Sequence, residues 1–471
     1  MDWRVERTSA FLTAQSVALQ LQGAGHSAYF AGGCVRDLLL CQPEKDFDVA
    51  TSARPDEVVA LFSHAGLRTA QVGAHFGVIL VCPPNGDQSK AIEVATFRHD
   101  GVYLDGRRPE SVQFSNDPRE DVMRRDFTIN GMLLDPAKVR PDDEGQLLVP
   151  QEALLDFVGG RADLDRRVVR AIGDPIVRFG EDKLRMLRGV RFAARLGFAV
   201  EPATLLAMQQ HAADIDQVSH ERVRDELTRM LTEGHASAAF EWLDRSGLLL
   251  EVLPEVAKMK GVQQPPEYHP EGDVWVHTLL LLEKLPADAS ATLAWGFLLH
   301  DVGKPATFQP PNPDKLKDRI RFNGHVEVGI RIAEVILERL RFSNEEKSQI
   351  LSLIQHHMQF GDVKAMKEST LKRFIRMPQF EEHLALHRAD CLSSHGDLRL
   401  WDYAKDAWED DAPTDARPKW LVSGHDLIAA GYKPGASFKK MLATVEDAQL
   451  EGRISTVEEG LALVREAFGL A

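Results

Sequence analysis

The fold is decided by SAYFAGGCVRDLLL at residues 27–40 and by DFDVAT at residues 46–51. The first stretch predicts a strand that runs into a Gly-Gly turn and then into a helix beginning near Cys34. The second stretch, like GVILV and AIEVATF further on, alternates or is rich in strand-forming residues over strand-like lengths. Residues 27–97 therefore predict a small mixed sheet with helices, preceded by an amphipathic helix over 3–22.

Two carboxylates stand close together in the second stretch. Asp46 and Asp48 are two residues apart on the expected strand, so their side chains share one face. Carboxylates at this spacing repel each other unless a cation lies between them, and Mg²⁺ prefers such ligands together with substrate phosphates. Glu93 on a neighbouring strand offers a third acid, which would complete a two-metal site. An isolated Asp-x-Asp is also typical of a solvated strand.

The Gly32–Gly33 turn lies between the expected strand and helix, where backbone N–H groups can cradle phosphate. Arg36 falls in the first turn of that helix, a poor place for a cation unless an anion binds beside it. The alternatives are a plain tight turn and a local ion pair between Arg36 and Asp37. Taken with the acids, the pattern favours a triphosphate site.

Four motifs in order, GGCVRDLLL, KDFDVAT, EVATFR and RRDFTING, resemble the head of the bacterial tRNA nucleotidyltransferase and poly(A) polymerase family, of the class II CCA-adding type. The resemblance implies a polymerase-β-like nucleotidyltransferase fold in which Asp46 and Asp48 bind Mg²⁺ and Glu93 supports them. It implies nucleotide contacts from Gly32, Gly33, Arg36, Arg124, Arg125, Asp126 and Asn130. The stretch GAHFGVILV lacks the Thr that the family often has after a His-Gly.

A further motif is EDKLRMLRGVRFAARLGF at 181–198, whose periodicity predicts a helix. Asp182 and Arg185 are three residues apart and would be neighbours on one helix face. A carboxylate and a guanidinium can hydrogen-bond the Watson–Crick edges of bases, although an ordinary helix ion pair has the same spacing. Residues 161–195 carry ten basic and five acidic side chains, which favours a polyanion as partner.

This stretch resembles the Glu-Asp-x-x-Arg motif of the same family. The resemblance implies that Asp182 and Arg185 act as a protein template that selects CTP and then ATP. It also places three arginines near the nucleotide or along the acceptor end of the RNA, namely Arg188, Arg191 and Arg195. SHERVRDELTRML at 219–231 resembles the neck region, in which we expect Glu221 and Arg222 to be structural.

Histidines and aspartates in the second half form another candidate site. His277 and Asp390 lie on separate expected helices. His300 and Asp301 close the apolar helix ATLAWGFLLH, and mixed nitrogen and oxygen ligands of this kind suit Zn²⁺, Mn²⁺, Co²⁺ or Ni²⁺. LLHDVGKP resembles the HD phosphohydrolase signature, which implies phosphatase or cyclic phosphodiesterase action on nucleotides or RNA ends. Candidates for a second metal or a substrate phosphate are His325 and one of His356 and His357.

The last region, 422–468, resembles the tail of the same nucleotidyltransferases. GYKPG is expected to form a turn between helices, with three basic residues nearby that either touch RNA or cap a helical hairpin: Lys433, Lys439 and Lys440. The resemblance thus divides the chain into four expected parts, a head at 1–155, a neck and body at 156–250, an HD domain at 255–410 and a tail at 415–471.

Composition agrees with a large globular protein. The chain has 471 residues, 44% hydrophobic and 27% charged, which predicts several domains. Four scattered cysteines without a Cys-x-x-Cys pair predict reduced thiols in a cytoplasm. The first residues lack the apolar core of a secretory signal, and no apolar run approaches about 18 residues, so no membrane partner is expected. The net charge of −15 argues against binding nucleic acid over the whole surface.

The expected function is template-independent addition of C, C and A to the 3′ end of tRNA from CTP and ATP. In this reaction the 3′ hydroxyl attacks the α-phosphorus and pyrophosphate leaves. The alternatives are a poly(A) polymerase, an enzyme that adds only CC or only A, and an HD phosphohydrolase whose head merely binds nucleotides. A mobile loop expected at His99–Pro118 would help to decide when synthesis stops.

Overall fold

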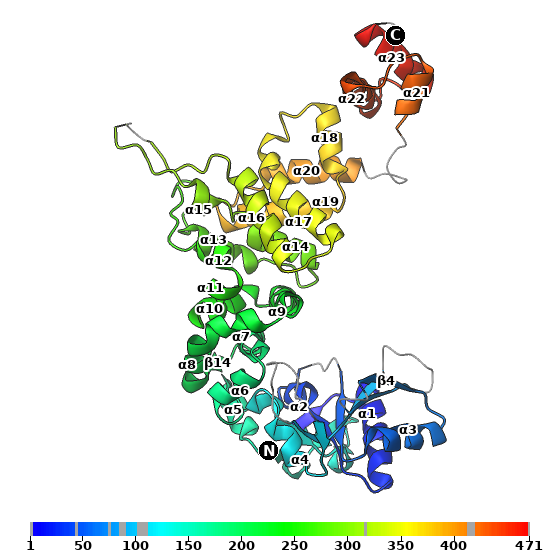
Figure 1. Cartoon of the computed structure of the whole chain (residues 1–471), viewed down its shortest axis with the longest axis vertical. Coiled ribbons are helices and arrows are strands. Elements are labelled where there is room, and N and C mark those ends of the chain that lie inside the picture. The colour runs from blue at the N-terminus through cyan, green and yellow to red at the C-terminus, as the bar shows by residue number, and fades with distance from the viewer. Residues whose placement is uncertain are drawn as a thin grey trace. The chain divides into compact units, whose positions relative to one another are not determined.

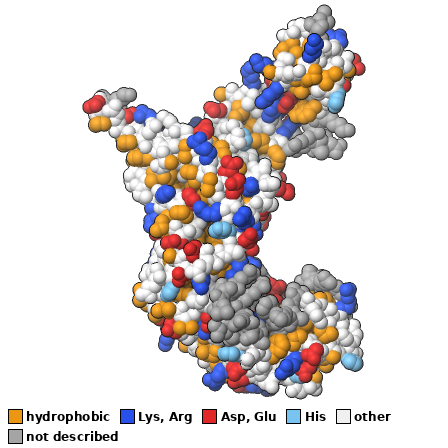
Figure 2. Space-filling model, viewed as in Figure 1, with side chains coloured by type: hydrophobic (Ala, Val, Ile, Leu, Met, Phe, Trp, Pro, Cys, Tyr) orange, Lys and Arg blue, Asp and Glu red, His pale blue; other side chains and the backbone are white. Residues whose placement is uncertain are grey.

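The computed structural model describes residues 3–42, 46–73, 77–83, 91–100, 112–314, 318–411 and 420–469. The chain folds into two compact units, Met1–Pro254 and Glu255–Ala471 (Figure 1). None of the described helices combines the length and the apolar character that a membrane crossing requires. Figure 2 shows acidic and basic side chains interspersed over the face in view.

A seven-stranded mixed sheet lies in the first unit, with the strand order β12-β9-β2-β3-β6-β5-β4. Its strands are β2 (Ala28–Ala31), β3 (Asp48–Thr51), β4 (Thr69–Gly73), β5 (Val78–Val81), β6 (Ile92–Thr96), β9 (Met132–Leu134) and β12 (Leu154–Asp156). Within it β3 runs parallel to β6, and the other neighbouring strands are antiparallel. The α+β class is therefore confirmed, and β9 and β12 extend the sheet beyond the predicted 27–97.

One helix before this sheet and three helices between its strands pack against it. They are α1 (Ser9–Gly23), α2 (Gly33–Leu39), α3 (Pro55–His64) and α4 (Pro118–Met123). The helix predicted over 3–22 is wrong at its start, because Trp3–Val5 forms β1 and pairs with β11 (Leu147–Val149). The helix itself begins after Thr8, whose side-chain oxygen accepts a hydrogen bond from the backbone N–H of Phe11 at 3.1 Å and so caps it.

The loop expected at 99–118 is only partly described. Its middle, 101–111, lies outside the described residues, as does most of the GAHFG stretch. Its ends are not loop, because β7 (Arg98–Asp100) and β8 (Val112–Phe114) form an antiparallel ladder in which Arg98 lies opposite Phe114. Three residues on each side are too few for an alternating pattern to stand out in sequence.

The rest of the first unit is mainly helical. The helices are α5 (Gly160–Arg166), α6 (Pro175–Glu181), α7 (Leu184–Leu196), α8 (Pro202–His211), α9 (His220–Thr232), α10 (Ala236–Arg245) and α11 (Leu248–Val252). The single helix predicted over 181–198 is corrected here, since Asp182 has extended backbone angles, φ −144° and ψ 107°, between α6 and α7. Its side chain accepts a hydrogen bond from the N–H of Leu184, the first residue of α7, at 3.1 Å.

The regular elements of the second unit are helices, and its described residues add two isolated β-bridges, Gln263 with Asp273 and Gln309 with Arg321. After α12 (Pro254–Ala257), which begins at the boundary, it contains α13 (Val274–Leu282), α14 (Ala291–Leu299), α15 (Lys304–Thr307), α16 (His325–Arg339), α17 (Asn344–His356), α18 (Glu368–Ile375), α19 (Phe380–Ser393) and α20 (Arg399–Asp410). Three tail helices follow, α21 (Gly424–Ala429), α22 (Ala436–Leu450) and α23 (Val457–Phe468), so the predicted GYKPG turn between helices is confirmed.

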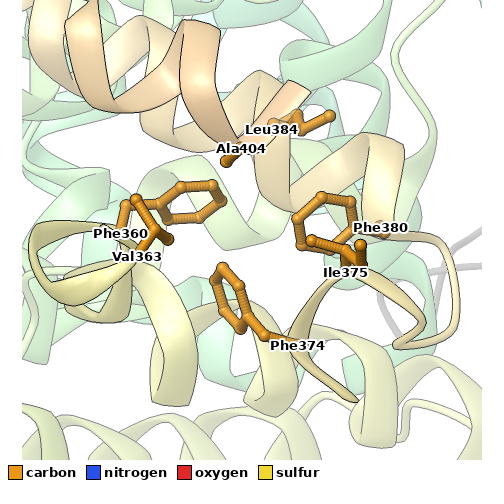
Figure 3. Close-up of a cluster of buried hydrophobic side chains, with 7 residues drawn as sticks. All are labelled: Phe360, Val363, Phe374, Ile375, Phe380, Leu384 and Ala404. Atoms are coloured by element: carbon orange, nitrogen blue, oxygen red, sulfur yellow. The ribbon is translucent and has the colours of Figure 1, made fainter. Parts of the chain in front are cut away.

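An aromatic core joins α18, α19 and α20 (Figure 3). Phe374 lies edge-on to both Phe360 and Phe380, with ring centroids 5.0 and 5.3 Å away. The tail packs on this part of the unit through α22, and Arg373 of α18 forms ion pairs with Glu446 at 2.6 Å and with Asp447. The tail helices also have a hydrophobic core of their own around Leu427.

Candidate active site and metal centre

The glycine turn, an arginine and an aspartate meet at one point of the first unit. Gly32 has φ +79°, a backbone conformation that favours glycine. A Cβ atom placed on Gly32 would lie 3.1 Å from Nη1 of Arg125 and 3.8 Å from Oδ2 of Asp48. The sequence prediction that the Asp-x-Asp stretch lies next to the double glycine therefore agrees with the geometry.

The three candidate acids lie at neighbouring strand positions. Asp48 begins β3 and lies opposite Glu93 of β6 in the parallel register, whereas Asp46 lies two residues before the start of the strand instead of on it. Burial, followed by the charges of Glu93 and Asp46, raises the pKa of Asp48 to about 6. Burial and the charge of Asp46 also raise the pKa of Glu93. Mutually repelling carboxylates with hard oxygen ligands fit a divalent cation.

A cavity of about 710 Å³ opens at this point. Except for Glu93, every residue that the sequence assigned to the nucleotide or its Mg²⁺ lines this cavity. It is also lined by side chains that sequence reasoning did not assign to nucleotide binding, including Phe192, Arg222 and Glu233. Glu93 faces the acids from the neighbouring strand and acts on them through its charge.

Hydrogen bonds link the glycine helix to the base of the cavity. Arg36, only 2% exposed, donates through Nε to Asp37 at 2.8 Å and through Nη1 to Asn130 at 2.6 Å. Arg36 therefore forms the ion pair with Asp37 that the sequence offered as an alternative, and it also lines the cavity. Asn130 in turn donates to Asp126 at 3.1 Å, and Arg188 donates to the other oxygen of Asp126 at 2.6 and 2.8 Å.

The arginines of RRDFTING are held by a carboxylate that the sequence analysis missed. Asp121 of α4, 1% exposed, pairs with Arg124 at 2.7 Å and with Arg125 at 2.9 Å. The two positive charges outweigh the effect of burial and lower the pKa of Asp121. The three- and four-residue spacing from Asp121 to the arginines was the signal available in the sequence.

The expected Asp182–Arg185 pair does not form, although both side chains line the cavity. Arg185 instead donates to Glu181 at 2.6 Å and to the backbone oxygen of Arg124 at 3.0 Å. Asp182 accepts from Arg222 at 2.9 Å. The cause is the break between α6 and α7, which removes Asp182 from the helix that carries Arg185.

Of the further arginines, Arg191 is buried and Arg195 is partly exposed. Arg191, 5% exposed, donates to Glu226 at 2.7 Å and to Glu233 at 3.2 Å. Arg195 lies 3.6 Å from Asp37. Both side chains also line the cavity, so the basic stretch at 161–195 contributes to its wall.

The second unit gathers the predicted histidines and aspartates into two groups whose ligand atoms lie within 4.8 Å of one another. The first group is His277, His300 and Asp390, and the second is Asp301, His325 and His357. Asp301 joins them, since its Oδ2 lies 3.2 Å from Nε2 of His300. Of the two histidines left open by sequence, His357 belongs to the site, whereas His356 lies against Phe374 and His383.

The hydrogen bonds of these histidines leave the same ring nitrogen for a metal. The Nδ1 atoms of His300, His325 and His357 bond to backbone oxygens at 2.9, 3.0 and 2.7 Å. The Nε2 atom of His277 lies 3.1 Å from Oδ1 of Asp390, and that of His300 lies 3.2 Å from Oδ2 of Asp301, so both nitrogens face the carboxylates of the site. Burial, followed by the charge of His300, lowers the pKa of His357 to about 4, which favours the neutral imidazole that binds metals. Burial lowers the pKa of His277, but hydrogen bonds with Asp390 and Glu271 raise it overall to about 9, so a metal ion at that ring would displace a proton. The combination of imidazole nitrogens and carboxylate oxygens fits a divalent metal.

Two further residues orient the metal site. Glu271 accepts from Nδ1 of His277 at 2.7 Å, which turns the other nitrogen of that ring toward the site. Lys304 lies 2.7 Å from Asp301. The charges of Lys304 and His300 outweigh burial and hold the pKa of Asp301 well below its usual range. A cavity of about 790 Å³ beside the site is also lined by Arg319 and Arg321, of which Arg321 pairs with Asp318. Two guanidinium groups thus lie near the candidate metal ligands, where a phosphate could bind.

Comparisons with known proteins cover the whole chain. Family models match at residues 28–170 (poly A polymerase head domain), 197–260 (probable RNA and SrmB-binding site of polymerase A) and 273–394 (HD domain). The CCA-adding enzyme of Streptococcus thermophilus is 30% identical over 98% of both chains. That of Limosilactobacillus fermentum is 40% identical, but the match spans only 47% of this chain and 50% of the relative. The structure of the Bacillus stearothermophilus CCA-adding enzyme in complex with CTP is 26% identical over 98% of each chain, with a TM-score of 0.72.

Proposed function

We propose, from the premise that the chain belongs to the CCA-adding enzyme family, that it adds C and A residues to the 3′ end of tRNA from CTP and ATP. The observation that carries this proposal is the cavity of the first unit. It brings together the Asp46–Asp48 pair, the double-glycine turn and the arginines of two distant motifs. These are the groups that a triphosphate and a transferring phosphoryl group require.

The reaction forms a bond between the 3′ hydroxyl oxygen of the RNA and the α-phosphorus of the nucleotide. The bond from the α-phosphorus to the β-phosphate breaks, and pyrophosphate leaves. Asp46 and Asp48 would hold Mg²⁺, which when bound neutralises charge on the phosphates and activates the attacking hydroxyl. The Gly32–Gly33 backbone and Arg125 position the triphosphate beside these acids, so catalysis rests mainly on positioning and electrostatics.

Base selection would fall to Asp182 and Arg185. Cytosine and adenine each present an amino donor next to a ring-nitrogen acceptor, whereas uracil and guanine present a carbonyl oxygen where the amino group would be. An acceptor carboxylate beside a donor guanidinium therefore matches the first two bases and mismatches the others. Asp126, fixed by Arg188 and Asn130, is our candidate for the ribose contact.

The test of the carboxylate site uses Asp46→Asn and Asp48→Asn. We expect each variant to lose incorporation of both CMP and AMP by at least about a hundredfold while tRNA still binds, because the charge that holds the metal is removed. Asp56→Asn, an exposed acid in the first turn of α3, is the matched control and should keep full activity. Wild-type addition by both variants would refute the site.

Nucleotide dependence separates this function from the nearest alternatives. Purified protein is given tRNA that lacks CCA, together with CTP or ATP singly and then both. We expect two C additions from CTP and completion with A when ATP is also present. A long A tail from ATP alone would instead indicate a poly(A) polymerase, and an arrest after CC or a demand for preformed CC would indicate a partial enzyme.

A second activity is favoured by the histidine–aspartate groups of the other unit. Because Asp301 of one ligand group lies 3.2 Å from His300 of the other, beside a cavity that Arg319 and Arg321 also line, we propose a metal-dependent phosphatase or phosphodiesterase acting on nucleotides or RNA ends. The mixed ligands suit Zn²⁺, Mn²⁺, Co²⁺ or Ni²⁺. We expect His300→Ala and Asp301→Ala to lose both bound metal and hydrolysis of a 2′,3′-cyclic nucleotide. Unchanged hydrolysis would contradict the proposal.

Three expectations from the sequence remain proposals. The division into four parts, at 1–155, 156–250, 255–410 and 415–471, is one. The contact of Lys433, Lys439 and Lys440 with RNA is another, and these lysines are exposed on the tail. The third is a cytoplasmic place of action, which agrees with four free cysteines.

A further inference from the structure

The position of Arg222 at the start of a helix is electrostatically unfavourable for a cation unless an anion lies nearby. It lies in the first turn of α9, where the helix dipole disfavours a cation. Its Nη2 donates to both oxygens of Asp182, at 2.9 and 3.2 Å, across 40 residues of sequence. Both side chains line the nucleotide cavity and are mostly shielded from solvent, with 22% and 16% of their surfaces exposed.

The carboxylate of Asp182 accepts hydrogen bonds from two different helices. The N–H of Leu184 donates to its Oδ1 at 3.1 Å from the start of α7, and Arg222 reaches it from α9. Arg185 is engaged elsewhere, with Glu181 and the backbone oxygens of Arg178 and Arg124. In the described part of the chain, Arg222 is therefore the charged side chain that hydrogen-bonds this carboxylate.

We propose that Arg222 is a positioning residue for base selection, which holds the carboxylate of Asp182 in the orientation that receives the amino group of cytosine or adenine. This inference rests on the proposed base-reading role of Asp182. A carboxylate has about four acceptor positions, so the bonds from Leu184 and Arg222 leave positions for a base. Without Arg222 only one bond remains, and the carboxylate can rotate away from the amino group, which weakens discrimination against uracil.

The experiment measures kcat and KM for CTP and for UTP on tRNA that lacks CCA, using Arg222→Met and Arg222→Lys. In the Met variant we expect the ratio of kcat/KM for CTP to that for UTP to fall roughly tenfold, mainly through a higher KM for CTP. The Lys variant restores one charged donor and should recover part of the ratio. Arg224→Met is the matched control, because Arg224 lies on the same helix, pairs with Asp225 and is not among the cavity-lining residues.

A mutant cycle with Asp182→Ala separates the possible roles of Arg222. If Arg222 acts through Asp182, Arg222→Met lowers the CTP-to-UTP ratio in the wild-type background and has no further effect in Asp182→Ala. An equal loss for CTP and UTP, or a loss that persists in Asp182→Ala, would indicate a phosphate or RNA contact and overturn the inference. The Lys variant supplies the same comparison if the Met variant unfolds, as judged by thermal melting.

Two different results distinguish a failure of the base-reading role of Asp182 from a failure of the positioning role of Arg222. An Asp182→Ala variant with the wild-type CTP-to-UTP ratio would overturn the proposed base-reading role and this inference together. If Asp182→Ala lowers the CTP-to-UTP ratio of kcat/KM but both Arg222 variants keep the wild-type ratio, the proposed function stands. That result would overturn only the role of Arg222.

Discussion

At the scale of single residues, Asp126 shows how neighbouring groups in the cavity stabilise a buried negative charge. Burial alone would raise the pKa of Asp126, but the charge of Arg188 and hydrogen bonds from Asn130, Arg188 and the backbone of Phe127 lower it to about 2. Both oxygens of the carboxylate therefore accept hydrogen bonds. Asn130, which donates to one of them, also accepts a hydrogen bond from Arg36. A satisfied network of this kind fixes side chains before a ligand arrives.

We expect Asp126→Asn to destabilise the protein by about 2 kcal/mol near pH 7, from a folded pKa of about 2 against an ordinary 3.8. Because the folded pKa is depressed, this stability is present above the unfolded pKa and is lost as pH falls toward the folded value. Urea unfolding of both proteins from about pH 7 to about pH 3 should show their difference shrinking at the acid end.

The control for this measurement is Asp165→Asn. Asp165 forms an exposed ion pair with Arg161, its side chain being 57% exposed, so its loss should change stability by less than about 1 kcal/mol. A difference between Asp126→Asn and the wild type that stays constant with pH would contradict the assigned pKa.

At the scale of elements, two glycines let α15 and α16 approach each other beside the metal ligands. A Cβ atom on Gly303 would lie 2.1 Å from the backbone oxygen of His325 and 2.6 Å from the backbone N of Gly329. Backbone atoms cannot yield as a flexible side chain can. The close approach therefore sets the position of His325 relative to Asp301, which lies two residues before Gly303.

Gly303→Ala should destabilise the second unit by about 1–3 kcal/mol and lower its metal content, because the added methyl group forces the two helices apart. Gly361→Ala is the matched control, since nothing lies within 4 Å of a Cβ atom at that position and its φ is not positive. Thermal unfolding and elemental analysis of the purified variants check both effects. Wild-type metal content in Gly303→Ala would show that metal binding does not depend on the close approach of α15 and α16.

Elements with a long or repeated pattern could be predicted from the sequence. The strand and turn at 28–33, the acids at 46–48 and the helix that carries His277 follow from alternation and periodicity. The break at Asp182 could not, because apolar periodicity continues on both sides and the break lies in the extended backbone of that one residue. The partner of Asp182 was also out of reach, since only the packing of α7 against α9 brings Arg222 to it.

At the scale of the whole molecule, two chemically different sites lie in separate compact units. Among the residues that the structure describes, those that line the nucleotide cavity all belong to the first unit, and the histidine–aspartate groups all belong to the second. The first site offers carboxylate oxygens, which suit Mg²⁺, and the second offers imidazole nitrogens, which suit transition metals. The division of ligand chemistry predicts that the two metal sites can be emptied independently.

We expect His300→Ala to remove the bound transition metal while changing CTP incorporation by less than about twofold, because that side chain lies outside the nucleotide cavity. Asp48→Asn should do the reverse and keep the full transition-metal content. Elemental analysis and the addition assay on the same preparations give both readings. Loss of nucleotide addition in His300→Ala would show that the units are coupled.

The parallel pairing of β3 with β6 has a practical consequence for protein engineering. Hydrogen-bond register holds Asp48 and Glu93 side by side, so their separation does not depend on how much chain connects the two strands. The connecting segment contains an exposed turn at Gly66, between α3 and the edge strand β4. A short epitope grafted into that turn should leave CMP incorporation intact, which makes it an attachment point for following the enzyme on its RNA.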